Sequence, residues 1–250
     1  LQEHVKFLYS HGSMYKCYNN NLLFHGCIPL NEDGTFRKVS VNGTGYYGRQ
    51  LLEKINEICI KAYFGKKDSE ERENACDMMW YLWCGENSPL YGKDKMAAFE
   101  RYFTGSPEVS DEIYTPYFEL SQNPEICDMI FDEFGLDSST AHIINGHVPV
   151  KLKDGESPVK AGGKLYVIDG GISKAYQSRT GIAGYTLIYD SHSLNLAQHT
   201  PFSEEKMESA PTVTVVERMP QRVNISDTDM GVKIREKLED LSELLKAYRN

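Results

Sequence analysis

Leu22-Leu23-Phe24-His25-Gly26 and Ile143-Ile144-Asn145-Gly146-His147 are two short apolar runs that each end on a histidine and a glycine. An apolar run of this length is typical of a buried strand, and a histidine where the strand passes into a loop places its imidazole at a sheet edge. The adjacent glycine lets the backbone approach a ligand closely. Because the two runs are far apart in the sequence, both imidazoles can bind one metal only if the fold brings these strands together.

Helical patterns dominate the first half of the chain around these runs. Apolar residues recur at helical spacing from Gly48 to about Tyr63, and Gly65 is placed to end that helix. A second helix is predicted from Glu70 to Trp83, since acidic residues follow Ser69 as the helix dipole favours. Two further helices are predicted, near Lys95 to Phe103 and from Pro124 to Phe134, whereas residues 1–21 are polar and end in an Asn-rich stretch.

The second half consists of β-branched runs separated by Gly-rich turns, which predicts mainly sheet. The expected strands are Ala141 to Asn145, Lys164 to Ile168, Ala183 to Tyr189, Leu194 to His199 and Thr212 to Glu217. Thr228 to Tyr248 carries an apolar stripe that predicts an amphipathic helix, which we expect to dock on its own sheet, with a second subunit as the alternative. The predicted organisation is an α/β part over 1–140, a β-rich part over 141–220 and a helical tail over 221–250.

Composition limits the classes of function. The chain has 250 residues, of which 40% are hydrophobic, so it can bury a substantial core. A net charge of -9 argues against general nucleic-acid binding, and no apolar stretch reaches the roughly 20 residues that span a bilayer. Its six cysteines form no CxxC pair, which favours reduced thiols. Without a signal-peptide pattern, we expect a cytoplasmic protein that binds neither nucleic acid nor membrane.

Histidine chemistry leaves two interpretations open. Two neutral imidazoles at adjacent strand ends would supply two ligands of a transition-metal site, whereas each histidine could instead be structural in its turn. The chain contains no Gly-Asp-x-x-Asp-Arg or Gly-Asn-His motif, so the carboxylates of a two-metal hydrolytic centre are not visibly supplied by it. His142 could orient a ligand, although a hydrogen-bonded strand histidine is the simpler interpretation.

Basic residues and glycines alternate between Gly146 and Gly184, in an otherwise acidic chain. They indicate either a phosphate-binding surface or a series of hairpins with lysine at their edges. The aromatic stretch from Trp80 to Gly85 precedes further basic residues and is either a pocket wall or a helix end packed in the core. The candidates for binding a phosphate group are Lys93, Arg101, Lys151, Lys164, Lys174 and Arg179.

Several longer stretches closely resemble one family of enzymes. They are Leu22 to Pro29, Trp83 to Leu90, Ile143 to Lys151, and Lys164 to Tyr189 with its Ile168-Asp169-Gly170-Gly171 turn. Together they resemble the class III fructose-1,6-bisphosphatases of bacteria, which belong to the calcineurin-like metallophosphatases. The likeness runs from about residue 1 to Arg249.

The resemblance implies the C-terminal part of an αββα sandwich that holds two metals at strand ends. By this resemblance His25 and His147 hold the second metal, usually Mn²⁺, together with an Asn and a bridging Asp from earlier motifs that this chain lacks. Mn²⁺ would therefore be absent or weakly bound in the chain alone, and its partner is the missing N-terminal part of the enzyme. Pro149 stands where many relatives have a further histidine, so that ligand is ruled out.

The implied activity is metal-dependent hydrolysis of the 1-phosphate of fructose 1,6-bisphosphate to fructose 6-phosphate, a step of gluconeogenesis. The chain alone is expected to be inactive because the other metal ligands are missing. Two alternatives remain: a non-catalytic regulatory or oligomerisation module from Ala161 onward, and a protein phosphatase of the same superfamily. A second copy of the chain is a candidate partner in either case.

Overall fold

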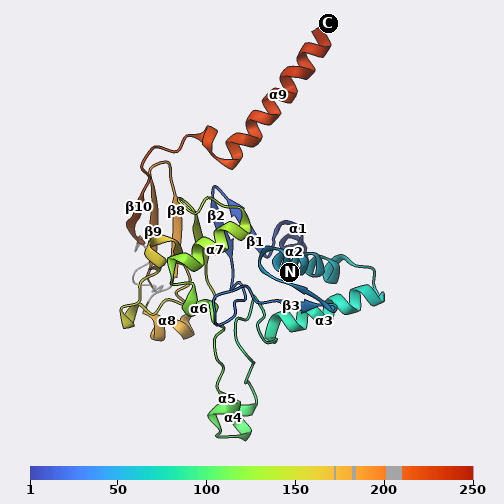
Figure 1. The fold of residues 1–250 in the computed structure, drawn as a ribbon, viewed down its shortest axis with the longest axis vertical. Coiled ribbons are helices and arrows are strands. Elements are labelled where there is room, and N and C mark those ends of the chain that lie inside the picture. Colours follow the sequence, from blue (N-terminus) through green and yellow to red (C-terminus); the bar gives the residue numbers. More distant parts are fainter. Residues whose placement is uncertain (172, 182–183, 201–209, 250) are drawn as a thin grey trace. The chain divides into compact units, whose positions relative to one another are not determined.

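The computed structural model describes residues 1–171, 173–181, 184–200 and 210–249. They form two compact units, of which unit 1 comprises Leu1–Pro149 with Pro158–Asp169, and unit 2 comprises Val150–Ser157 with Gly170–Asn250. Each unit contains both helices and strands, so the predicted α/β class is confirmed (Figure 1). The division of the chain at residues 140 and 220 stays a prediction.

A five-stranded mixed sheet forms the centre of unit 1. Its order is β1 (Tyr15–Tyr18), β2 (Asn21–Phe24), β5 (His142–Asn145), β7 (Leu165–Val167) and β6 (Val159–Lys160). The three central strands, β2, β5 and β7, are parallel, and the two outer strands pair antiparallel with their neighbours. Continuous apolar runs are typical of parallel strands that are covered on both faces. The two runs that end in histidine are thus neighbouring parallel strands, and they end at the same edge.

The asparagines before β2 make a tight hairpin turn. Asn19 and Asn20 both have positive φ angles, of 48° and 59°, between strands β1 and β2. A two-residue turn with both central residues left-handed matches the twist of paired strands, and asparagine tolerates this conformation. The polar stretch 1–21 therefore contains structure that its composition did not indicate, including helix α1 (Gln2–His11).

Three predicted helices of unit 1 are confirmed. They are α2 (Gly48–Phe64), α3 (Glu70–Cys84) and α7 (Pro124–Phe134). Ser69 caps α3 by accepting a 3.4 Å hydrogen bond from the N–H of Arg72, and the left-handed Gly135 ends α7. The remaining helical elements of this unit are α4 (Glu100–Phe103), α5 (Pro107–Ser110), α6 (Tyr117–Leu120) and the short turn η2 (Ala161–Gly163).

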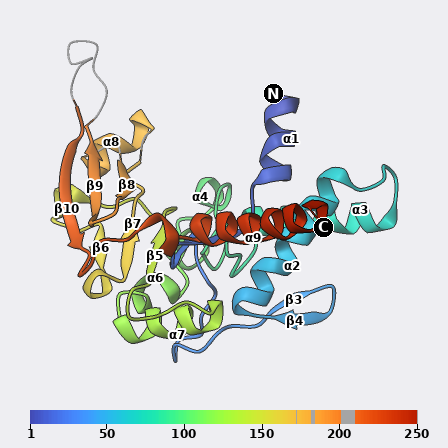
Figure 2. The same ribbon diagram turned by 90° about the horizontal axis from the view of Figure 1, so that it is seen from above.

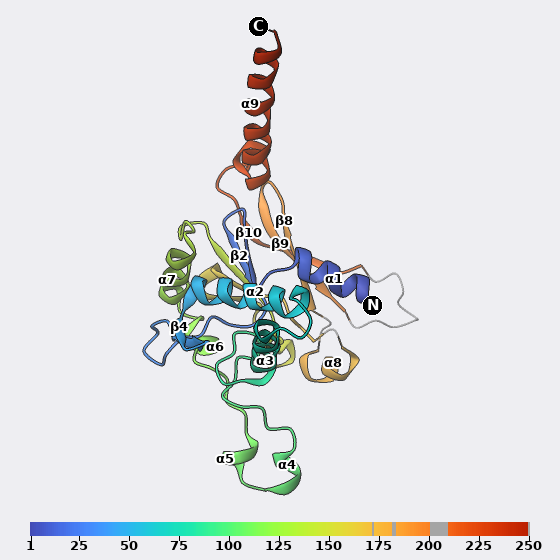
Figure 3. The ribbon, with the colours of Figure 1, turned by 90° about the vertical axis from the view of Figure 1, so that its right-hand side faces the viewer.

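The predicted helix from Lys95 to Phe103 is wrong except for its last four residues, which form α4. Side-chain acceptors take the backbone N–H groups at its start, since Asp94 accepts from the N–H of Lys95 and Glu112 from that of Ala97. Residues 94–113, here called the projecting loop, extend away from the rest of unit 1 with α4 and α5 at their far end (Figure 1, Figure 3). The N–H of Asp94 donates to the carbonyl oxygen of Ile113 at 2.9 Å and closes the base of this loop.

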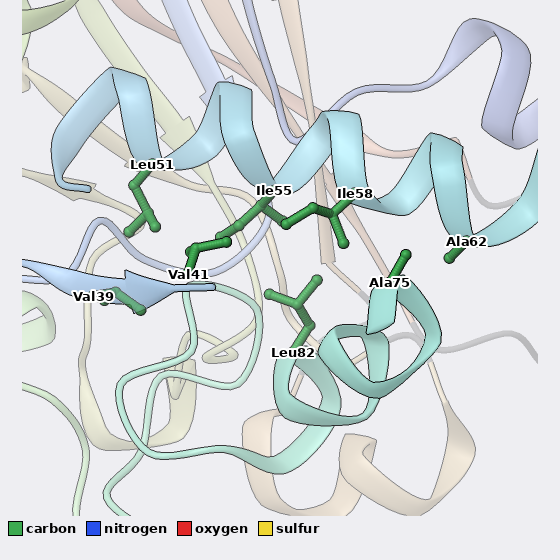
Figure 4. Close-up of a cluster of buried hydrophobic side chains, with 8 residues drawn as sticks. All are labelled: Val39, Val41, Leu51, Ile55, Ile58, Ala62, Ala75 and Leu82. Carbon is green, nitrogen blue, oxygen red and sulfur yellow. The ribbon is translucent and has the colours of Figure 1, made fainter. Parts of the chain in front are cut away.

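A hydrophobic cluster joins α2 and α3 to the hairpin of β3 (Val39–Val41) and β4 (Thr44–Tyr46) (Figure 4). Its buried members are Val39, Val41, Leu51, Ile55, Ile58, Ala62, Ala75 and Leu82. The α2 members recur at helical spacing, so the pattern that predicts this helix also identifies its buried face. Burying such a face stabilises the helix more than its intrinsic propensity does.

Unit 2 contains a three-stranded antiparallel sheet, in the order β10 (Thr212–Arg218), β9 (Ser193–His199) and β8 (Gly184–Tyr189) (Figure 2). These strands confirm three of the predicted runs, although Ala183 lies outside the described residues. Helix α8 (Lys174–Thr180) and the short turns η1 (Leu152–Asp154) and η4 (Ile225–Asp227) complete the unit together with α9 (Asp229–Arg249).

Helix α9 confirms the predicted amphipathic helix but not its docking. Its stripe remains open to solvent, with side chains exposed to the extent of 46% at Ile234, 59% at Leu238, 60% at Leu241 and 83% at Tyr248. The expectation that the stripe packs on its own sheet is therefore wrong, and only Gly231 of this helix is buried. No helix among the described residues combines the length and the apolar character needed to cross a membrane.

Candidate metal centre

The structure brings His25 and His147 together at the edge where β2 and β5 end. Leu23 and Ile144 are partners in the parallel register, so the loops after the two strands start side by side. Nε2 of His25 lies 3.2 Å from Nδ1 of His147, and the ring centroids are 5.0 Å apart with planes inclined at 75°. The convergence of the two distant imidazoles is thus found in the fold.

This spacing fits two ligands of a single ion. Imidazole nitrogens bind Zn²⁺ at about 2.0–2.1 Å, so two of them at angles near those of tetrahedral or octahedral coordination lie about 2.8–3.4 Å apart. The 3.2 Å between Nε2 of His25 and Nδ1 of His147 falls in that range. The same two atoms are also within hydrogen-bond geometry, so one ion could contact both nitrogens once the rings turn toward a common point.

The tautomer of His147 follows from its second ring nitrogen. Nε2 of His147 lies 2.8 Å from the carbonyl oxygen of Tyr91, and a carbonyl can only accept a hydrogen bond. Nε2 therefore carries the proton, and the lone pair of Nδ1 faces His25. A ligand histidine commonly donates its other N–H to a carbonyl or carboxylate, which fixes the orientation of the ring.

The electrostatic environment keeps His147 neutral. Burial lowers the pKa of His147 below its ordinary value, and the nearby His25 and Lys93 act in the same direction. The carbonyl of Tyr91 and the carboxylate of Asp169 oppose this change in pKa without reversing it. A neutral imidazole is the form that binds metal, because binding requires a free lone pair.

The side chain of Asn145, on β5, links the loop that contains His25 to a buried residue of unit 1. Its Nδ2 donates to the Tyr117 hydroxyl at 3.0 Å and to the Gly26 carbonyl oxygen at 3.4 Å. Its Oδ1 is buried without a partner among the described atoms. Tyr117 is fully buried, so this asparagine ties the His25 loop to the interior of unit 1 one residue before Gly146.

The backbone near the site has one residue in a left-handed conformation and one unusually close approach between two segments. His147 itself has a φ of 68°, in the left-handed region that disfavours side chains with a Cβ. Gly26 lies so close to the neighbouring segment that a Cβ there would come within 2.3 Å of the carbonyl oxygen of Pro89. These features fix where each imidazole can lie.

The described part of the chain supplies only a partial ligand set. Within it, no three His, Cys, Asp or Glu side chains converge closely enough to hold a metal ion. Asp169 follows strand β7 at the same edge, and its Oδ2 lies 4.0 Å from the position that a Cβ on Gly146 would take. The two imidazoles thus form a pair of ligands that needs completion from outside these residues.

Among the predicted phosphate-binding residues, Lys93 has a charge that acts on the pKa of His147. Its ammonium lies 2.6 Å from Oε2 of Glu112 and 5.4 Å from the ring centroid of Tyr91, whose carbonyl contacts His147. Arg101 lies in the projecting loop and donates through Nε to the carbonyl of Ser110 at 3.1 Å.

The other predicted residues lie elsewhere. Lys164 pairs with Asp128 and comes just before Leu165, at the end of β7 opposite the histidines. His142 begins β5, also at the opposite end, and its Nδ1 lies 3.1 Å from Oδ1 of Asn21. Lys151, Lys174 and Arg179 belong to unit 2, and their contact with phosphate stays a prediction.

Three residues near the histidines were not predicted as part of the site. Asp169 could have been found, since it follows an apolar strand at the same sheet edge as both histidines. Tyr91 acts through its backbone carbonyl, which no side-chain pattern reveals. Glu112 reaches Lys93 from 19 residues away along the projecting loop, and only the folded loop brings them together.

Comparisons with known proteins cover the whole chain. A family model described as Firmicute fructose-1,6-bisphosphatase matches residues 1–250. Fructose-1,6-bisphosphatase class 3 of Clostridium botulinum strain 657 is 51% identical over 255 residues, covering 100% of this chain and 38% of that protein. A class 3 enzyme of Clostridium beijerinckii is 51% identical over 253 residues, covering 99% of this chain and 38% of that protein. The chain thus spans 38% of the length of these relatives, and no solved structure matches it.

Proposed function

Because this chain belongs to the Firmicute fructose-1,6-bisphosphatase family, we propose that it is part of an enzyme that hydrolyses the 1-phosphate of fructose 1,6-bisphosphate. The product is fructose 6-phosphate, and the reaction is a step of gluconeogenesis in the cytoplasm. The observation that carries this proposal is the 3.2 Å approach of His25 and His147 at the end of two parallel strands. Two imidazoles at one sheet edge support a metal-dependent phosphatase, in which a bound ion activates water and the phosphoryl group.

The two histidines are the proposed ligands of one metal ion, through Nε2 of His25 and Nδ1 of His147. Mn²⁺ suits a site where imidazoles are joined by oxygen ligands, and the ion supplies Lewis-acid activation of water and of the phosphoryl group when bound. The hydrogen bond from His147 to the carbonyl of Tyr91 orients the ring for this role. We assign the surrounding architecture to an αββα metallophosphatase sandwich that the rest of the enzyme completes.

The chain's own basic residues bind and orient the substrate in this proposal. Lys93 lies two residues after Tyr91, whose carbonyl contacts His147, and its charge acts on the pKa of His147, so its ammonium is our candidate donor to phosphoryl oxygens at this site. Since the described residues hold no converging group of three ligands, we assign the remaining metal ligands to the part of the enzyme beyond these 250 residues. The chain alone is therefore expected to release no phosphate even with Mn²⁺ present.

Alanine substitutions in the full-length enzyme test the proposal. His25→Ala and His147→Ala should each lower kcat/KM for fructose 1,6-bisphosphate by at least about a hundredfold, a usual loss when metal ligation is disrupted. The bound Mn²⁺ measured by elemental analysis should fall in parallel. His4→Ala is the matched control, because His4 is exposed on α1 and should retain activity and metal.

Full activity and metal content in both variants would remove these histidines from the site. The same assay distinguishes a protein phosphatase. An intact enzyme that dephosphorylates phosphopeptides and leaves fructose 1,6-bisphosphate untouched would overturn the proposed substrate, while the metal-ligand assignment would stand on the metal analysis.

We also propose that α9 mediates contact with a second copy of the enzyme. Its stripe of Ile234, Leu238, Leu241, Leu245 and Tyr248 is spaced four, three, four and three residues apart, the repeat of a coiled-coil seam. Sedimentation of the full-length enzyme with and without residues 228–250 tests this. An unchanged mass after truncation would remove the stripe from any role in oligomerisation.

A further inference from the structure

We propose that Glu112 is a positioning residue that holds the ammonium of Lys93 at the edge of the two-histidine site, where it meets the phosphate group of the substrate. The inference rests on the proposed function and deepens it, since it identifies how the projecting loop takes part in substrate binding. Sequence patterns give Glu112 no role, because it lies in a loop 19 residues from Lys93.

The carboxylate of Glu112, near the end of the projecting loop, contacts residues at the start of that loop. Its Oε2 lies 2.6 Å from Nζ of Lys93, and its Oε1 accepts a 3.0 Å hydrogen bond from the N–H of Ala97. Arg101 adds a longer contact, with Nη2 4.0 Å from Oε1. A carboxylate held at both oxygens has little freedom to move, so it fixes the direction in which Lys93 points.

Lys93 is further confined by aromatic rings. Its ammonium lies 5.4 Å from the ring centroid of Tyr91 and 5.2 Å from that of Tyr114, within the range of cation–π attraction. The side chains of Lys93 and Glu112 are only 20% and 16% exposed. A pair this protected from water is screened less than a surface ion pair, and loss of one partner leaves the other partly buried and uncompensated.

The same segment connects Lys93 to the metal site. Tyr91, two residues earlier, offers its carbonyl oxygen to Nε2 of His147. The backbone of residues 91–93 therefore carries both the group that orients His147 and the cation held by Glu112. A displacement of Lys93 would change the charge beside the candidate metal while the imidazole stays oriented.

Lys93 can serve Glu112 and a phosphate group at once. An ammonium has three N–H donors, and the bond to Glu112 uses one of them. Burial alone would raise the pKa of the Glu112 carboxyl, but its hydrogen bonds from Lys93 and Ala97 hold the pKa below its ordinary value. The carboxylate is thus ionised near neutral pH and keeps its hold on the lysine.

Kinetics of the full-length enzyme with Mn²⁺ test this role. Glu112→Gln should raise KM for fructose 1,6-bisphosphate, and the inhibition constant of inorganic phosphate, each by about tenfold, with kcat within about threefold. Lys93→Met should raise both constants by about thirtyfold, and adding Glu112→Gln to it should cause no further change. Glu57→Gln is the matched control, since Glu57 pairs with Lys54 at 2.7 Å on α2 and should leave all constants unchanged.

A purely structural glutamate would lower thermal stability and leave both constants unchanged, and that result overturns the proposal. Equal effects of Glu112→Gln with and without Lys93 would also overturn it. If Glu112→Gln does not fold, Glu112→Asp withdraws the carboxylate by one methylene and must show the same rise in KM. If the proposed function is wrong, the parent enzyme does not hydrolyse fructose 1,6-bisphosphate. Calorimetry then still compares the affinity of Glu112→Gln for inorganic phosphate with that of the parent.

Discussion

The backbone N–H of Gly146 donates a 3.0 Å hydrogen bond to the carbonyl oxygen of His25. This bond extends the pairing of β2 and β5 into the loops that follow them, so the two loops cannot separate without losing it. Together with the Asn145 side chain below, it sets the spacing of the two imidazoles through the backbone. The sheet therefore fixes the arrangement of the candidate site.

Close packing at Gly26 predicts a large effect of a single methyl group. Gly26→Ala would place a Cβ 2.3 Å from the Pro89 carbonyl oxygen and 3.1 Å from that of Leu90. The segments must move apart, so we expect a loss of about 1–3 kcal/mol in the free energy of unfolding, measured with urea. Gly105→Ala is the control, because its Cβ would meet nothing within 4 Å. Equal stabilities of the two variants would contradict the close approach.

Removing the Tyr117 hydroxyl should weaken the support beneath the histidines. Tyr117→Phe leaves Nδ2 of Asn145 with only the 3.4 Å contact to Gly26. A buried donor that loses its better partner costs about 1–2 kcal/mol of unfolding free energy. Tyr102→Phe, at a residue that is 83% exposed, should change this energy by less than about 0.5 kcal/mol. Identical denaturation midpoints for both variants would exclude this supporting role.

The thiol of Cys27 should resist alkylation over a wide pH range. Burial raises its pKa to about 12, against a weaker opposing effect of the hydrogen bond from Thr115. At pH 8 iodoacetamide should therefore modify the exposed Cys76 and spare Cys27 in the folded chain, as peptide mass spectrometry can determine. Rapid labelling of Cys27 under native conditions would contradict this and would show that the structure around Cys27 opens to solvent.

The same raised pKa has a consequence for stability. The Cys27 thiol ionises near pH 9 when unfolded but stays protonated up to about pH 12 when folded. Its contribution to stability is therefore complete below about pH 9 and is lost as the pH rises toward 12. Cys27→Ala should reduce the fall in unfolding free energy between pH 8 and pH 10. A fall of the same size in both proteins would assign the alkaline sensitivity to other groups.

The cluster between α2 and the β3–β4 hairpin should dominate the stability of its part of unit 1. Ile55 is fully buried there, so Ile55→Ala should lower the unfolding free energy by about 2–5 kcal/mol. Ile60 lies on the same helix and is 39% exposed, so Ile60→Ala should cost clearly less. The comparison by urea denaturation uses one residue type on two faces of one helix, and equal losses would contradict the assigned buried face.

Local signals explain which elements the sequence predicts well. Helices α2, α3 and α7 each have an apolar stripe or a cap within their own residues. The first residues of the predicted helix at Lys95 follow a different path because Glu112, distant in sequence, takes the N–H of Ala97. Docking of α9 also depends on distant surfaces, so its stripe predicts an amphipathic helix without locating a partner.

The candidate site could likewise be predicted only where local sequence signals exist. His25 and His147 could be selected because each follows an apolar strand, and parallel pairing of β2 with β5 then places them at one edge. The contacts that refine the site come from a carbonyl at Tyr91 and a carboxylate at Glu112. Neither leaves a periodic or motif-like trace, because backbone groups exist at every residue and loop carboxylates are common.

The left-handed backbone of His147, with φ at 68°, has an evolutionary consequence. Glycine would occupy this conformation without the roughly 1 kcal/mol or more that a side chain costs there. Selection for thermal robustness alone would thus drive this position toward His147→Gly, at the expense of the imidazole. Under the proposed metal-binding role of His147, a lineage that loses catalysis and keeps the fold should drift to glycine here, so the residue at this position would distinguish active from inactive homologues.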